Sequence, residues 1–163
     1  MRPLIVIMGV SGSGKSTIGE LLAQRLGVPY ADADDLHPQA NVDKMAAGHP
    51  LCDADRWPWL VKVGVALTAA EHTGMVMACS ALKRSYRDVI LAEEQRTIFI
   101  HLHGSRELLE SRMGQRRGHF MPTSLLDLQL EDLEPLQADE PGFVIAIDQS
   151  PQQIVDSAIA VLG

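Results

Sequence analysis

The sequence predicts an α/β fold in which a central parallel sheet of about five strands is covered by helices on both faces. Four apolar runs, each about as long as a strand buried on both faces, occupy residues 4–10, 74–80, 97–103 and 143–148. Helical patterns separate these runs, and strands that alternate with helices are typical of a parallel sheet. The first run leads directly into a glycine-rich loop, as in phosphate-binding α/β proteins.

The individual elements follow from local patterns along the chain. After the first strand, a helix over 16–26 carries its apolar residues on one face, namely Ile18, Leu21, Leu22 and Leu26. A shorter apolar stretch at 28–34 is a weaker strand candidate. Further helical patterns lie between and after the later strands, at 53–71, 85–94, 105–117, 123–134 and 151–162.

Composition and charge exclude several classes of function. A length of 163 residues favours one domain, spanning 1–163, and 46% hydrophobic residues suffice for a buried core. The net charge of −7 argues against nucleic-acid binding, because phosphate backbones require basic surfaces. Cys52 and Cys79 form no CxxC pair, so we expect neither a disulfide framework nor a zinc site. The apolar N-terminal run is too short to span a bilayer, and we expect a cytoplasmic protein without a membrane partner.

Residues 9–16 read GVSGSGKS and match the phosphate-binding motif G-x-x-x-x-G-K-[ST] in full. A strand before the loop and a helix after it allow the loop amides and the helix N-terminus to point at phosphate oxygens. We expect Lys15 at the β- and γ-phosphates and the Ser16 hydroxyl at Mg²⁺. The motif therefore predicts the P-loop nucleoside-triphosphate fold, with a nucleotide held by Gly9, Val10, Ser11, Gly12, Ser13, Gly14, Lys15, Ser16 and Thr17.

Three carboxylates, Asp32, Asp34 and Asp35, follow the second strand candidate, at the sheet edge where parallel α/β proteins bind ligands. Residues two apart in a strand share a face, so Asp32 and Asp34 are both expected to face the nucleotide. One of them could hold Mg²⁺ while the other takes the proton of an attacking hydroxyl. The alternative is three loop carboxylates that partly cap the next helix.

The next segment carries His37, Asn41 and Lys44 at helical spacing on one face. Three different donor groups beside an acidic pair suit the recognition of a polyhydroxy molecule. A solvated helix face is the alternative.

A basic cluster, Lys83, Arg84 and Arg87, follows the strand at 74–80. Such a cluster suits an anionic substrate, because arginine can bind a carboxylate through two parallel hydrogen bonds. A surface basic patch is the alternative. Arg56 is a further candidate, and it could instead pair with Asp53 or Asp55.

A segment at about 112–124 is a candidate mobile lid, because glycine and proline interrupt the helical pattern and several basic residues lie there. A lid that closes over a nucleotide brings arginine charge to the transferred phosphoryl group and excludes water. We favour Arg116 for this catalytic role because it shares a helix face with Arg112. An ordinary loop between two helices is the alternative.

The position of the carboxylates favours a kinase over a switch or motor. Switches and motors usually carry an apolar strand that ends in aspartate, whereas the strand at 74–80 ends in Cys79 and Ser80. The residues thus predict a kinase whose acceptor is a small, anionic, hydroxylated molecule. An ATP-dependent regulator without a metabolite substrate is the alternative from another class.

Together these segments resemble the gluconate kinases, small P-loop enzymes related to shikimate and nucleoside monophosphate kinases. The resemblance rests on GVSGSGKS, DADDLHPQANVDKM, PLCDADRWPWL, CSALKRSYRD and RRGHFMP, spread over residues 9–122. It implies transfer of the ATP γ-phosphoryl group to the 6-hydroxyl of D-gluconate, with Mg²⁺, a lid and often a homodimer. Shikimate or a nucleoside monophosphate is the alternative acceptor.

The resemblance also assigns roles to individual residues. Asp34 looks like the residue that orients the hydroxyl and accepts its proton. Asp32 and Ser16 are the expected metal ligands. Substrate contacts are implied for Asp34, His37, Asn41, Lys44, Arg56, Lys83, Arg84 and Arg87. One departure is Ala33, which stands where the family pattern tends to have glycine.

Overall fold

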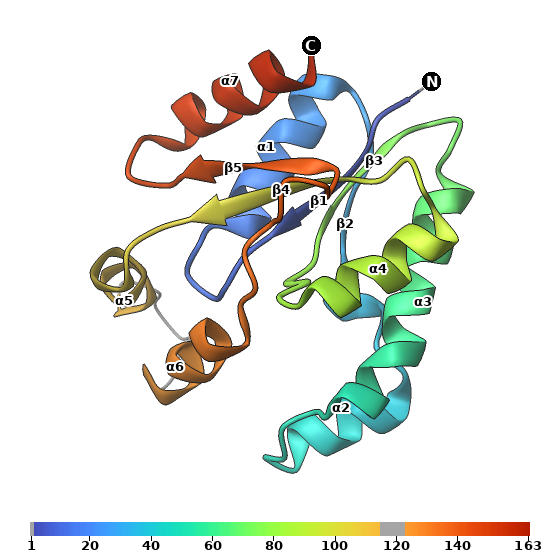
Figure 1. Ribbon diagram of the computed structural model, residues 1–163, viewed down its shortest axis with the longest axis vertical. Helices are drawn as coiled ribbons and strands as arrows, with labels where there is room; N and C mark the ends of the chain where they lie inside the picture. The colour runs from blue at the N-terminus through green and yellow to red at the C-terminus, as the bar shows by residue number, and fades with distance from the viewer. Residues whose placement is uncertain (1, 115–122) are drawn as a thin grey trace.

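The computed structural model describes residues 2–114 and 123–163 and confirms the predicted parallel sheet (Figure 1). Its five strands are β1 (Leu4–Met8), β2 (Tyr30–Asp32), β3 (Met75–Ala78), β4 (Ile98–His103) and β5 (Gly142–Ala146). The helices are α1 (Lys15–Leu26), α2 (Gln39–Ala46), α3 (Asp53–Ala69), α4 (Arg84–Glu93), α5 (Arg106–Gly114), α6 (Thr123–Asp132) and α7 (Pro151–Leu162). The strand order is β2-β3-β1-β4-β5, and each neighbouring pair is parallel.

The central strand β1 divides the hydrophobic core into two halves. Ile5 and Ile7 belong to the cluster formed with α1 and α7, whereas Val6 and Met8 belong to the cluster formed with α3 and α4. This alternation follows from the twofold period of a strand. Figure 1 shows the same layers, with α1 and α7 on one side of the sheet and α3 and α4 on the other. Both faces of β1 are therefore buried, as its continuous apolar sequence predicts.

Glycine allows the chain to turn tightly from β1 into α1. Gly9 has a φ of +153°, and a Cβ atom there would lie 2.7 Å from Ser13 Oγ and 3.0 Å from the Leu102 carbonyl oxygen. Gly14, immediately before α1, has a φ of +93°, a conformation that costs glycine little. The loop between them therefore lies close to the ends of β1 and β4.

The prediction of a strand over 28–34 was wrong beyond Asp32. The chain leaves β2 at Asp32 and forms a 3₁₀ turn over Ala33–Leu36, in which Asp32 Oδ1 accepts a hydrogen bond from the Asp34 amide at 2.9 Å. This local cap competes with extended backbone, as short carboxylate side chains commonly do. Asp32 and Asp34 therefore do not alternate along one strand, and the helix that was expected to include His37 begins only at Gln39.

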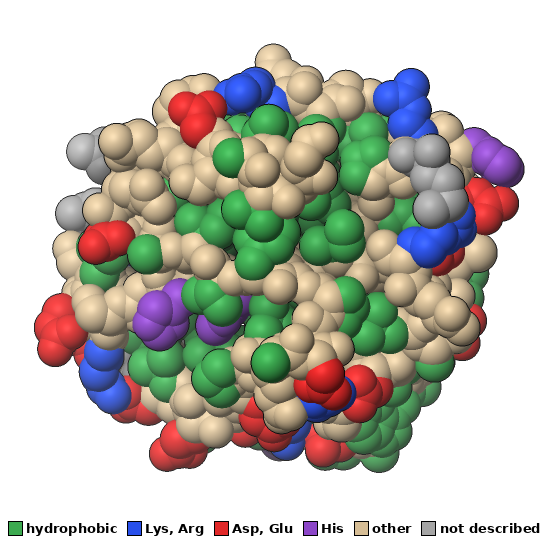
Figure 2. Space-filling model, turned by 45° about the horizontal axis from the view of Figure 1, so that its top comes forward, with side chains coloured by type: hydrophobic (Ala, Val, Ile, Leu, Met, Phe, Trp, Pro, Cys, Tyr) green, Lys and Arg blue, Asp and Glu red, His purple; other side chains and the backbone are tan. Residues whose placement is uncertain are grey.

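Within the described ranges, no helix is long and apolar enough to cross a membrane. Figure 2 shows a face whose middle is largely hydrophobic and whose charged groups lie mostly toward its edge. The visible Lys and Arg side chains form small separate groups with Asp and Glu nearby. A continuous basic surface is therefore not present among the described side chains on this face.

Candidate functional site

The glycine-rich loop lies at the carboxyl edge of the sheet, after the central strand. From β1 the chain runs to β2 and β3 on one side of this strand and then crosses from β3 to β4 on the other side, and such a change of direction creates a ligand crevice in open α/β sheets. The Gly9 amide donates to the Ser80 carbonyl at 3.4 Å, and the Ser13 amide donates to the Val10 carbonyl at 3.2 Å. The loop is therefore tied both to the end of β3 and to itself.

Lys15 begins α1 and folds back over the loop. Its Nζ donates to the carbonyl oxygens of Gly9 at 2.9 Å and of Val10 at 3.2 Å. Ser16 and Thr17 follow in the first helical turn, beside the helix N-terminus. This combination of amides, cation and hydroxyls is suited to a polyphosphate.

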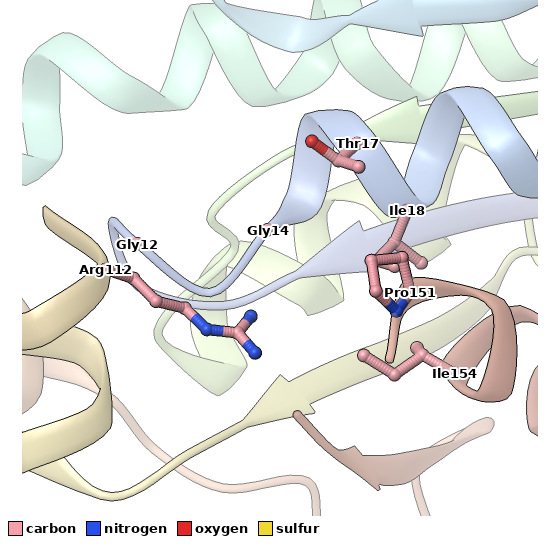
Figure 3. A pocket seen from close by; sticks show the side chains of 7 residues that line it. All are labelled: Gly12, Gly14, Thr17, Ile18, Arg112, Pro151 and Ile154. Atoms are coloured by element: carbon pink, nitrogen blue, oxygen red, sulfur yellow. The ribbon is translucent and has the colours of Figure 1, made fainter. Parts of the chain in front are cut away.

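A cavity of about 200 Å³ opens beside the loop (Figure 3). Its lining combines the loop and α1 with α5 and α7, through Gly12, Gly14, Thr17, Ile18, Arg112, Pro151 and Ile154. Arg112 extends from α5 toward the side where Pro151 lies, and its guanidinium donates to the Ile147 carbonyl at 2.7 Å. From the sequence we had assigned Arg112 to the candidate lid. Pro151 and Ile154 were predicted only to be part of the helix at 151–162.

The Asp34 carboxylate lies near His37 and close enough to Lys15 to feel its charge. Its Oδ1 is 4.0 Å from His37 Nε2. Burial against neighbouring atoms, and then the charge of Asp32, raise the pKa of Asp34, whereas His37 and Lys15 oppose the rise. The side chain is still 82% exposed, so solvent screens this shift in the ligand-free protein. Burial lowers the pKa of His37, which favours a neutral imidazole at pH 7.

His37, Asn41 and Lys44, the predicted polar stripe, lie close together. Each of these side chains contacts other residues of the protein. The His37 ring stacks on Trp59 with 4.2 Å between ring centroids. Asn41 donates to the Asp55 carbonyl at 2.9 Å, and its Nδ2 lies 3.2 Å from His37 Nδ1. Lys44 Nζ donates to Asp55 Oδ2 at 2.6 Å. These bonds brace α2 against the start of α3, so the stripe is not simply a solvated helix face, and its role in substrate recognition stays a prediction.

Arg56 and Lys83 come together although 27 positions separate them in the sequence. Each lies 3.6 Å from an oxygen of Asp53, and both cationic groups lie beside the Tyr86 ring, at 5.5 and 5.6 Å from its centroid. The Tyr86 hydroxyl donates to Asp53 Oδ1 at 2.5 Å. From the sequence we had named Asp53 only as a possible partner for Arg56, and we had not singled out Tyr86. We call Arg56, Lys83, Asp53 and Tyr86 the cation cluster.

Comparison with known proteins decides among the kinase families. The shikimate kinase family model matches residues 11–162. The thermoresistant gluconokinase of Escherichia coli strain K12 is 43% identical over 98% of this chain and 93% of its own length. A probable gluconokinase from Xenopus tropicalis is 44% identical, with 93% and 89% covered. The crystal structure of a gluconokinase from Sinorhizobium meliloti 1021 is 46% identical with a TM-score of 0.89, covering 99% of this chain and 93% of that chain.

The chain belongs to the gluconokinase family. A shikimate kinase from Acinetobacter baumannii, 18% identical with a TM-score of 0.61 and coverage of 99% and 93%, shares the fold. Ala33, where the resemblance led us to expect glycine, is packed in the core. Ala33 is fully buried in the core cluster below α3, and its carbonyl accepts a hydrogen bond from Trp59 Nε1 at 2.7 Å.

Within the gluconokinase motif SALKRSYRD, Arg87 does not have the substrate-facing position that we expected. Its side chain is 0% exposed and forms an ion pair with Glu140 at 2.6 Å. Its remaining bonds go to the carbonyl oxygens of Ala81, Leu82 and Glu134. Since the guanidinium N–H groups are used by internal acceptors, Arg87 has a structural position here and we leave it out of the proposed substrate contacts.

Arg84 also points away from the cation cluster. Its guanidinium makes two hydrogen bonds to the Asp139 carboxylate, at 2.9 and 2.7 Å, and one to Gln137 at 2.6 Å. It therefore ties the start of α4 to the segment before β5, on the surface. Arg116 lies outside the described residues, so its catalytic role stays a prediction.

Replacing Arg87 should affect stability more than replacing Arg84. Arg87→Ala leaves the Glu140 carboxylate buried without its counter-ion, which should lower the free energy of unfolding by about 3–5 kcal/mol. Arg84→Ala removes a surface ion pair and should cost at most about 1 kcal/mol. Urea denaturation at pH 7 measures both values. Equal, small losses would contradict the structural role of Arg87.

Proposed function

We propose that the protein transfers the γ-phosphoryl group of ATP to the 6-hydroxyl of D-gluconate, giving 6-phospho-D-gluconate and ADP, as one kinase domain. The observation that carries this proposal is a single sheet edge that holds the P-loop, the Asp34 carboxylate and the cation cluster. Together they provide a phosphate cradle, a base and an anion-binding group. Membership of the gluconokinase family supports gluconate as the acceptor.

On the nucleotide side, the P-loop amides and Lys15 bind the β- and γ-phosphates. Lys15 moves from the loop carbonyls, which it contacts now, to the phosphate oxygens. Mg²⁺ fits the oxygen donors of Ser16 and Asp32, because this ion keeps water and substrate phosphates among its ligands and needs few protein groups. Bound there, Mg²⁺ would neutralise charge on the transferred group.

On the acceptor side, Asp34 accepts the proton of the 6-hydroxyl as that oxygen bonds to the γ-phosphorus. The bond from the γ-phosphorus to the bridging oxygen breaks, and ADP leaves with the electron pair. Closure around the substrates excludes water, which strengthens the influence of burial on the Asp34 pKa. His37, Asn41 and Lys44 line the acceptor side, where His37 lies beside Asp34.

The cation cluster provides the carboxylate site for the acceptor. Arg56 and Lys83 now share one counter-ion, Asp53, whose side chain is 45% exposed. A gluconate carboxylate can take the place of Asp53 beside either cation without bringing a charge into an apolar site. Arginine then binds it through two hydrogen bonds, which fixes the orientation of the sugar acid.

A coupled ADP-release assay with a panel of sugar acids, shikimate and nucleoside monophosphates tests the acceptor. Gluconate should stimulate ADP release, and chelation by EDTA should abolish it until Mg²⁺ is restored. Stimulation by another acceptor alone would refute gluconate. Slow hydrolysis that no acceptor changes would instead favour a nucleotide-dependent regulator.

Asp34→Asn should lower kcat by at least about a hundredfold, because a positioned base contributes that much or more. Asp35→Asn, at the exposed neighbouring residue, is the matched control and should retain activity. In the wild type, kcat/KM should fall as the pH drops through the raised pKa of Asp34, because only the ionised carboxylate accepts a proton. A near-normal kcat in Asp34→Asn would remove Asp34 from this role.

The cavity beside the loop is suited to the adenine base, because Pro151 and Ile154 provide apolar surface and Arg112 provides a planar cation. Arg112→Ala should raise the Kd for ADP about three- to tenfold, the loss expected for one stacked cation. Arg25→Ala, on the surface of α1, is the control. Isothermal titration calorimetry measures both, and an unchanged Kd in Arg112→Ala would exclude this base position.

We also propose a homodimer formed through α3. Trp57, Val61 and Val65 lie four residues apart on one face of this helix and are 36%, 38% and 51% exposed. Val61→Glu should convert a dimer into a monomer of 17.8 kDa in light scattering. Val161→Glu, at an equally apolar exposed position on α7, should stay dimeric. A monomeric wild type at micromolar concentration would contradict the proposal.

A further inference from the structure

A side chain from α6 contacts the phosphate-binding loop directly. The Ser11 amide donates a hydrogen bond of 2.6 Å to Gln129 Oε1, across 118 positions of sequence. This contact is part-buried and connects the loop to the helix that precedes β5. The expected nucleotide contacts included Ser11, but nothing in the sequence singled out Gln129.

The position of Gln129 is determined by packing on both sides of it. Leu126, one turn earlier, is fully buried in the core cluster with α1 and α7, and Leu130 packs against the same cluster. Beyond the helix, the Glu134 amide donates to the Leu82 carbonyl at 2.7 Å. The Gln129 amide is thus presented to the loop by a helix anchored before and after it.

The bond has a specific consequence for the loop. Ser11 lies in the turn between Gly9 and Gly14, where Gly9, Gly12 and Gly14 all have positive φ. Gln129 offers a neutral oxygen that satisfies the Ser11 amide, and an unsatisfied part-buried amide would be costly. A neutral acceptor also leaves the positive potential of the loop unchanged, whereas a carboxylate would reduce it.

We propose that Gln129 is a positioning residue that holds the first turn of the P-loop in the conformation that binds nucleotide. It acts through Ser11 and does not itself contact phosphate. The inference rests on the proposed function in one respect, that the nucleotide binds at the P-loop. Because a preorganised loop loses less entropy on binding, removal of the bond weakens nucleotide binding in particular.

Two substitutions separate the hydrogen bond from the charge. Gln129→Met has a similar length and no amide, and it should raise the Kd for MgADP about three- to tenfold, as expected for one lost hydrogen bond. Gln129→Glu keeps an acceptor oxygen but adds a negative charge near the phosphates. Its weaker binding should recover toward the wild-type value as salt increases from low to high, because salt screens charge. The Gln129→Met defect should not recover.

Calorimetry with MgADP gives these Kd values, and the KM for gluconate should stay unchanged in Gln129→Met. Glu131→Met, at an exposed residue of the same helix, is the matched control and should bind like the wild type. A Gln129→Met protein with a lower melting temperature and an unchanged Kd would show that Gln129 stabilises the fold and does not affect nucleotide binding. Tighter binding would make it a competitor of phosphate, and either result overturns the proposal.

The same experiment distinguishes this inference from the proposed acceptor. A wild-type protein that binds MgADP without phosphorylating gluconate refutes the acceptor alone, and the Kd comparison still decides the role of Gln129. A wild type that does not bind MgADP refutes both.

Discussion

The buried guanidinium of Arg87 is the interaction on which the arrangement of the site depends. It joins the loop before α4, through the Ala81 and Leu82 carbonyls, to a segment distant in sequence, through the Glu134 carbonyl and the Glu140 carboxylate. Ala81 has a φ of +42°, an unfavourable conformation for a residue with a Cβ atom, and the bond to Arg87 helps to hold it. A buried ion pair of this kind is costly to break, because either partner alone would be an uncompensated charge.

Two parts of the site follow from this anchor. The loop that Arg87 holds at Leu82 continues into Lys83, so the cation cluster has a defined position relative to β3. The Glu134 end of the same network follows α6, whose Gln129 contacts the P-loop. The acceptor side and the nucleotide side are thus connected by packed and hydrogen-bonded elements. Loss of packing around Arg87 would therefore be expected to disturb both the cation cluster and the P-loop.

Charge is arranged differently in the anchor and in the cation cluster. Arg87 and Glu140 are both buried, at 0% and 1% exposure, and their charges are compensated within the protein. Arg56 and Lys83 are partly exposed and share one carboxylate, so an anionic ligand can exchange with it. Arg87 and Arg56 therefore differ in their capacity to bind a ligand, because their burial and their partners differ. A buried ion pair does not exchange its carboxylate for a ligand, whereas an anion-binding site has to accept a ligand in place of the protein carboxylate.

The sequence by itself determined the parallel α/β fold, the P-loop and the kinase family, because each depends on local pattern. The run 4–10 predicts a strand buried on both faces, and GVSGSGKS carries its own loop geometry. It left open whether Asp34 lies in the strand or in a capped loop, because the Asp32 cap competes with extended backbone only in the folded turn. It also assigned Arg87 to the substrate and overlooked Gln129. Only the tertiary structure decided the roles of these two residues. The burial of Arg87 beside Glu140 and the contact of Gln129 with Ser11 both join segments that are far apart in the chain.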